Sequence, residues 1–211
     1  MKRLPVLAAA LVAIAVAAMI GLGVWQLRRA DEKAVLLALY ERNRAMSSEI
    51  ALPIIAPVPD TALFRHASAM CLEVTEWRAV AGRGIDGRNG WRYLASCRRA
   101  SEGPGFIANM GVASTANLRP AWKGGAVSGQ VSLEPVASSL IATLVGRGDV
   151  PRPMIVAGQP APGLAPSAAA SPEDMPNNHL AYAVQWFVFA GIAALIFGIA
   201  LWRRRNDAPP A

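Results

Sequence analysis

The sequence LAYAVQWFVFAGIAALIFGIALW occupies residues 180–202 and contains no charged side chain over 23 consecutive positions. As an α-helix this stretch is about 34 Å long, enough to cross a hydrocarbon core of roughly 30 Å. The backbone polar groups of a segment in lipid must be satisfied internally, so a helix is the expected conformation. We therefore predict a transmembrane helix over residues 179–202, followed by a short tail at 203–211.

A second apolar block lies near the N-terminus, where residues 4–25 carry no charge. We predict a transmembrane helix at 4–27 that continues to about residue 46, because residues 26–46 lack Gly and Pro and are rich in good helix formers. A cleaved signal peptide is the competing interpretation. We favour retention, because the apolar run exceeds the usual 7–15 residues and does not end in a clear Ala-x-Ala site.

The charge pattern predicts the topology. Of the net charge of +7, the clusters at 2–3 and 203–205 with Asp207 supply 5 − 1 = +4. Basic residues beside membrane spans favour the cytoplasmic side, so both termini are expected there. If the protein is bacterial, the central domain is expected in the periplasm, and the chain is expected to be a multi-pass inner-membrane protein with the bilayer as a partner. The remaining 16 basic and 13 acidic residues give +3, which does not favour a nucleic-acid partner.

The central part of the chain has a sequence pattern typical of a β domain. Between residues 47 and 150, short apolar runs such as 91–97, 105–112 and 126–133 alternate with glycine-rich turns such as 82–90. This pattern predicts a mainly antiparallel sheet or small barrel. Residues 151–178 are rich in Pro and Ala, which predicts an extended connector with little packed core. The expected fold is therefore two transmembrane helices flanking a mainly antiparallel β domain.

Cys71 and Cys97 are the only cysteines, and both fall on predicted strands. An oxidising compartment would favour a structural disulfide between them. Two buried free thiols are the alternative. Thiol catalysis is disfavoured because the spacing is not C-x-x-C.

The chain has only two histidines, and His179 stands at the entrance of the second apolar helix. On a helix, Tyr182 and Trp186 lie within about 60° of it on one face. A neutral imidazole with flat aromatic neighbours is suited to ligate haem iron, but His, Tyr and Trp are also typical interfacial anchors, and composition alone favours the anchor. Asn177 and Asn178 are expected to cap the helix. His66 accompanies no acidic cluster, and a surface or packing role is expected for it.

The outer end of the first apolar helix carries a matching set of residues. Trp25 and Arg28 are expected to form an interface belt. Gln26 is a candidate for a hydrogen bond between the two helices. Gly21 and Gly23 are candidates for close helix approach. Because the sequence holds no nucleophile elbow, zinc-protease motif, P-loop or dinucleotide fingerprint, we expect a protein that is not an enzyme.

Two motifs in the sequence match a known family. Residues 23–29, GVWQLRR, resemble its G-x-W-Q-x-x-R signature, and residues 176–187, PNNHLAYAVQWF, resemble its P-x-N-H-x-x-Y-x-x-x-W-F signature. Both belong to the Surfeit locus protein family of cytochrome c oxidase assembly factors. The two-span layout with an outer domain is also similar. The central segment Asn109–Ser114 departs from the G-W-V-P-like segment that the family usually carries.

The resemblance implies a function and a set of site residues. It implies a factor that assists delivery of haem a to subunit I of cytochrome c oxidase, with that subunit and the haem a synthesis machinery as partners. His179 becomes the candidate haem-iron ligand, with Tyr182 and Trp186 beside the haem. The alternative is a haem-free scaffold that binds the nascent subunit I.

Overall fold

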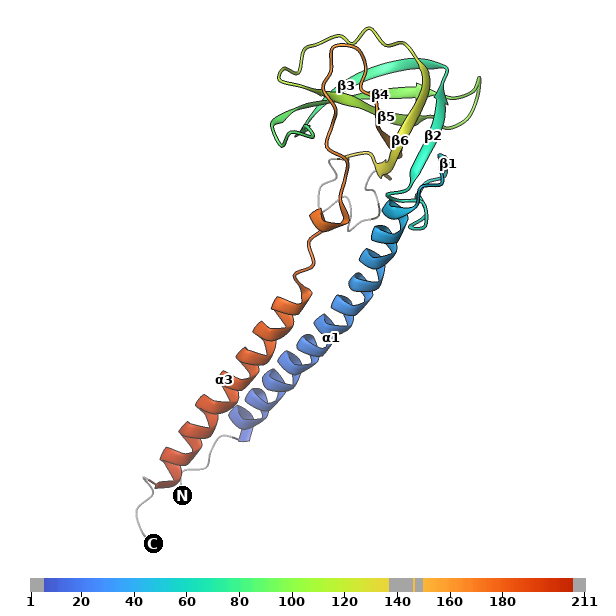
Figure 1. The fold of residues 1–211 in the computed structure, drawn as a ribbon. Coiled ribbons are helices and arrows are strands. Elements are labelled where there is room, and N and C mark those ends of the chain that lie inside the picture. The colour runs from blue at the N-terminus through green and yellow to red at the C-terminus, as the bar shows by residue number, and fades with distance from the viewer. Residues whose placement is uncertain (1–5, 137–145, 147–149, 207–211) are drawn as a thin grey trace. The chain divides into compact units, whose positions relative to one another are not determined.

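The computed structural model describes residues 6–136, 146 and 150–206 and divides the chain into two compact units (Figure 1). One unit contains the described residues up to Leu36 and those from Pro176 onward. The other runs from Leu37 to Met175. The first unit is helical and the second is mainly β, so the predicted fold of two terminal apolar helices and a mainly β domain is confirmed.

The helical unit is an antiparallel pair formed by α1 (Val6–Ala45) and α3 (His179–Asn206). Both helices are long and apolar enough to cross a membrane, by length and composition. The last turns of α1, from Leu37, belong to the β unit. There the buried Tyr40 donates a hydrogen bond to Asp60, 2.6 Å away, and Asn43 donates to the backbone carbonyls of Asp60 and Leu63.

The two helices pack along one narrow stripe of each, which we call the helix seam. Its residues are partly or fully buried, and they recur at spacings of three and four. The heptad-like repeat keeps one face of each helix against the other, as in a coiled coil. On α1 the seam residues are Ala9, Val12, Val16, Met19, Gly23 and Gln26, and on α3 they are His179, Ala183, Trp186, Ala190, Ala193, Phe197 and Leu201. The outer faces expose large apolar side chains, which suits a lipid environment.

The β unit is built on a seven-stranded sheet with the strand order β1-β2-β6-β7-β5-β4-β3. Neighbouring strands are antiparallel except for the pairs β1–β2 and β5–β7, which are parallel. The strands are β1 (Ile50–Ala51), β2 (His66–Cys71), β3 (Glu73–Arg83), β4 (Asn89–Arg98), β5 (Phe106–Ala113), β6 (Gly125–Leu133) and β7 (Pro153–Ala157). A short 3₁₀ helix, η1 (Pro172–Asp174), lies just before Met175, the last residue of the β unit.

The core of this unit is apolar and centred on β4, β5 and β7. Leu94, Ile107, Met154 and Val156 form a buried cluster. Burying side chains of this size stabilises the fold by about 1.5–3 kcal/mol each. The β3–β4 hairpin turns through residues 84–88, where Gly87 has a φ of 79° that few other residues adopt readily.

Strand β7 corrects the prediction of an extended connector over 151–178. All five residues of β7 are buried, and the strand lies between β5 and β6 in the interior of the sheet. The prediction gave weight to the many prolines around it. Met154, Ile155 and Val156 are a short apolar run of the kind expected for a strand buried on both faces. Residues 158–171 that follow contain no helix or strand of their own in the structure.

The sheet curls so that strands far apart in its order meet. A disulfide joins Cys71 at the end of β2 to Cys97 on β4, with a Cα–Cα distance of 5.1 Å. Beside it, the backbone N–H of Leu72 donates to the carbonyl of Arg98 at 2.8 Å. Three strands separate β2 from β4 in the sheet order. The domain therefore has the curvature of a small barrel, visible in Figure 1.

Candidate functional site

The helix seam contains one polar contact between the predicted site residues. His179 Nδ1 lies 2.7 Å from Gln26 Oε1, and the pair is partly buried. His179 is the first residue of α3, and Gln26 lies on the seam face of α1. The sequence predicted that Gln26 would hydrogen-bond between the helices, and the structure shows this bond with His179 as its partner.

With the Gln26 amide oriented as in the structure, this contact places a proton on Nδ1 of His179. An amide oxygen only accepts hydrogen bonds, so Nδ1 must donate to Gln26 Oε1. In a neutral imidazole the other nitrogen, Nε2, then keeps its lone pair. No hydrogen bond to Nε2 occurs within residues 6–136, 146 and 150–206. His179 therefore presents a bare nitrogen in a fixed ring orientation, which is the arrangement found when a metal-binding histidine is held by a second residue.

Close packing next to this pair depends on a glycine. Gly23 is buried on the seam, and a Cβ placed on it would lie 2.6 Å from the ring of Phe187. No atom lies within 4 Å of the equivalent Cβ at Gly21. Of the two glycines predicted to allow close approach, Gly23 makes the helix contact and Gly21 does not. Ala183, four residues after His179 on α3, is also fully buried.

The two aromatic residues predicted beside His179 occupy different environments. Trp186 is half-buried on the seam and stacks edge-on against Phe189, with ring centroids 6.3 Å apart. Tyr182 is half exposed. Among the described residues, neither side chain is hydrogen-bonded to His179.

The remaining predicted partner residues lie at the same end of the helix pair. Asn178 stands at the N-cap of α3, and its carbonyl accepts the N–H of Tyr182 at 3.1 Å. Asn177 is exposed beside it. On α1, Trp25 is 52% exposed and Arg28 is exposed. These side chains are therefore available to a lipid headgroup or to another protein.

The other predicted residues lie in the β unit. Cys71 and Cys97 form the disulfide described above. His66 begins β2 and is exposed. Within the part of the chain that the structure describes, no group of three or more His, Cys, Asp or Glu side chains is arranged to hold a metal ion.

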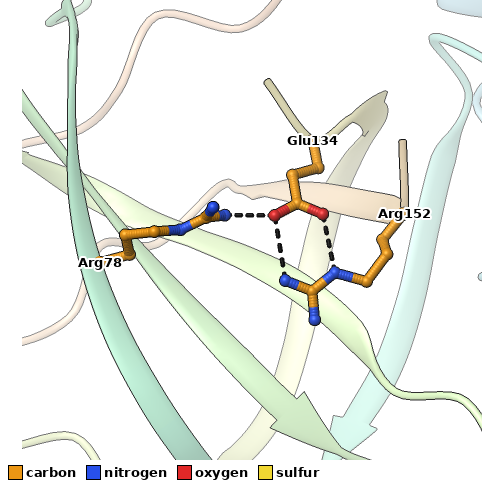
Figure 2. Close-up of polar contacts among 3 residues, drawn as sticks. All are labelled: Arg78, Glu134 and Arg152. Carbon is orange, nitrogen blue, oxygen red and sulfur yellow. Dashed lines mark hydrogen bonds and ion pairs between the residues drawn. The ribbon is translucent and has the colours of Figure 1, made fainter. Parts of the chain in front are cut away.

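A polar cluster that the sequence did not predict is formed by Arg78, Glu134 and Arg152 (Figure 2). The carboxylate of Glu134 is only 5% exposed and pairs with both arginines. Arg152 donates from Nε at 2.7 Å and from Nη2 at 3.0 Å, and Arg78 bonds to Oε1. The hydrogen bonds from Arg152 and then Arg78 hold the pKa of Glu134 below its usual range, against the effect of burial.

The Glu134 cluster has a structural role. Arg78 comes from β3, at one end of the strand order, whereas Glu134 follows β6 and Arg152 precedes β7. The cluster therefore connects the edge strand to the middle of the sheet, as the disulfide connects β2 to β4. Charge-assisted bonds of this bidentate kind are among the stronger polar contacts in proteins.

The family of the chain follows from comparison with known proteins. A family model described as the SURF1 family matches residues 13–191, which include both apolar helices and the β domain between them. The chain belongs to the SURF1 family. This family is associated with cytochrome c oxidase assembly, and its members are assembly factors rather than enzymes. A comparison with curated proteins found none that matches.

The residues of this SURF1 chain fit a haem group at one point. His179 would supply one ring nitrogen, oriented by Gln26, to hold a haem iron. Haem iron would supply a centre that accepts the lone pair of this nitrogen. His66 is the only other histidine, and it belongs to the β unit.

Proposed function

We propose that this SURF1-family protein assists the delivery of haem a to subunit I of cytochrome c oxidase. His179 would hold the haem iron through Nε2, with Tyr182 and Trp186 beside the ring. The observation that carries the proposal is the 2.7 Å contact between His179 Nδ1 and Gln26 Oε1, because it leaves Nε2 with a free lone pair. Subunit I and the haem a synthesis machinery are the partners of this activity.

The position of the pair suits transfer rather than permanent storage. A carrier must bind haem and then release it, so a single protein ligand near the helix end is more suitable than a closed pocket with two ligands. In the proposed topology, both chain ends are cytoplasmic and the β domain lies in the periplasm of a bacterial inner membrane. His179 and Gln26 are then at the periplasmic rim of the two spans.

The test is to purify the full chain in detergent from cells that synthesise haem a and to measure haem a per protein by absorbance. We expect His179→Ala to lose most of the haem a. Gln26→Leu removes the acceptor that fixes the imidazole, and we expect a loss of affinity of about 10-fold or more, as is typical for residues that orient metal ligands. Gln26→Glu keeps an acceptor oxygen and should retain more haem a than Gln26→Leu.

The control is His66→Ala, which removes the exposed histidine of the β unit. Equal haem a in the wild type and His179→Ala would show that His179 is not the ligand. Equal haem a in Gln26→Leu and the wild type would remove the positioning role of Gln26.

A haem-free scaffold that binds the nascent subunit I is the second candidate. The half-exposed rings of Trp25 and Tyr182 on the helix pair favour it, because exposed aromatic side chains are common in protein interfaces. It predicts that His179→Ala cells assemble normal amounts of oxidase and that subunit I co-purifies with the variant.

A further inference from the structure

A pocket of about 690 Å³ opens beside the β3–β4 hairpin, and residues 168–170 form its opposite wall. Backbone hydrogen bonds hold this wall against the hairpin. The N–H of Ala168 donates to the carbonyl of Arg83 at 2.9 Å, and the N–H of Ile85 donates to the carbonyl of Pro166 at 3.1 Å. The volume lies within the range of about 300–1,000 Å³ that is typical of small-molecule sites.

The side chains that line the pocket are small, with three polar exceptions. The exceptions are Arg83, Asn89 and Arg92, and the other lining residues are glycines and alanines. None of the lining residues is acidic. Two arginines and one asparagine are therefore the polar residues that line this space, and none of its lining side chains is a carboxylate.

Arg92 is the central group of this pocket. Its Nε is buried and has no hydrogen-bond partner, and its Nη2 donates only to the carbonyl of Ala81 at 3.3 Å. Burial lowers the pKa of this guanidinium. A half-buried charge without a counter-charge is unfavourable, and an anion placed against it would remove that cost.

Some other arginines of the same domain are paired with carboxylates. Arg78 and Arg152 bind Glu134, and Arg98 binds Glu73. Arg92 has no carboxylate partner among the described residues, although its side chain is partly buried. The charge of Arg92 is therefore free to pair with an anion from outside the chain.

Gly82 is required for the position of Arg92. A Cβ on Gly82 would lie 2.2 Å from Arg92 Nε and 2.5 Å from its Cγ and Cδ. The arginine side chain therefore lies directly across the glycine, in space that any other residue would fill. Because the obstacle is a flexible side chain, an added methyl group would displace the arginine without breaking the strand.

We infer that this pocket binds a small organic anion, whose carboxylate or phosphate group pairs with Arg92 and Arg83. Guanidinium groups match the planar, two-oxygen geometry of both anions. The volume exceeds that of a lone inorganic ion, and the alanine wall accommodates a short carbon skeleton. The same chemistry is available from a soluble carboxylic or phosphate ester and from the headgroup of an anionic lipid.

The experiment is calorimetric titration of the full chain in neutral detergent with citrate and, separately, with glycerol 3-phosphate. We expect saturable binding of at least one anion. Arg92→Gln should weaken it at least tenfold. The matched control is Arg88→Gln, which removes the same charge from the same hairpin. Arg88 is 88% exposed, lies outside the pocket lining, and should bind like the wild type.

Gly82→Ala separates geometry from charge, because it leaves the net charge unchanged and displaces Arg92. We expect it to lose binding as Arg92→Gln does, while its melting temperature without ligand stays close to that of the wild type. Binding only to nanodiscs that contain phosphatidylglycerol, with the same loss in both variants, assigns the anion to a lipid headgroup. Absence of saturable binding to all three probes, or equal binding by the wild type and Arg92→Gln, overturns the inference.

Discussion

Glu134 is a residue whose ionisation should be visible in the stability of the whole β domain. Its side chain is 5% exposed, and two arginines hold it in the charged form. Because the folded-state pKa is lower than in the unfolded chain, the ion pairs contribute fully at pH values above the ordinary carboxyl pKa. Their contribution is lost as the pH falls through the folded pKa.

We therefore predict that Glu134→Gln lowers the free energy of unfolding at pH 7 by about 2 kcal/mol, a value that allows for the partial exposure of both arginines. As the pH falls below about 4.3, the wild type should lose stability faster than the variant. Tryptophan fluorescence during denaturant unfolding measures both effects. The exposed Glu102→Gln is the control. A variant with unchanged stability at pH 7 would show that the cluster contributes nothing.

At the same scale, the sequence identified single residues well where a motif surrounded them. His179 and Gln26 were both selected from the sequence, and the structure brings them together. The contact between Glu134 and Arg78 was not predicted, because these residues are 56 positions apart in the sequence and meet only when the sheet curls. Arg92 and Gly82 were missed for a similar reason, since their contact depends on the register between β3 and β4.

At the scale of elements, the helix seam depends on one small residue of α1. A Cβ at Gly23 meets the Phe187 ring, whereas the space beside Gly21 is open. We predict that Gly23→Ala destabilises the helix pair by about 1–2 kcal/mol, because overpacking outweighs the helix-favouring effect of Ala. Gly21→Ala should be neutral or slightly stabilising. Thermal unfolding of both variants in detergent provides the comparison. Equal melting temperatures would contradict the inference that Gly23 is needed for close packing of the two helices.

Elements were predictable where their sequence period was clear. The long uncharged runs predicted both helices, and alternation with glycine turns predicted β4, β5 and β6. Strand β7 was missed because five residues within a proline-rich stretch give too short a pattern for its period to be recognised. Its place between β5 and β6 is set by long-range pairing, which local sequence does not encode.

At the scale of the whole molecule, the open question is which side of the membrane holds the β domain. Three observations favour the periplasm. Basic clusters flank both apolar helices at the chain ends, and such clusters favour the cytoplasm. The two helices are antiparallel, so the C-terminal end of α1 and the N-terminal end of α3 lie at the same end of the pair, away from the chain termini. The β domain connects these two helix ends in the sequence. The disulfide between Cys71 and Cys97 would persist in an oxidising compartment but is rarely kept in the cytosol.

We predict that protease added to intact spheroplasts degrades the β domain but leaves a C-terminal epitope tag protected. In the same cells, alkylation of acid-trapped protein with a maleimide mass tag should give no shift before reduction and a two-tag shift after it, because the disulfide occupies both cysteines. A cytoplasmic protein of the same cells must stay intact, which confirms that the membrane is sealed. A protected β domain together with cysteines that react before reduction would place this domain in the cytoplasm. His179 and Gln26 would then lie at the cytoplasmic rim of the two spans. That outcome would contradict the proposal that haem a is delivered from the periplasmic rim.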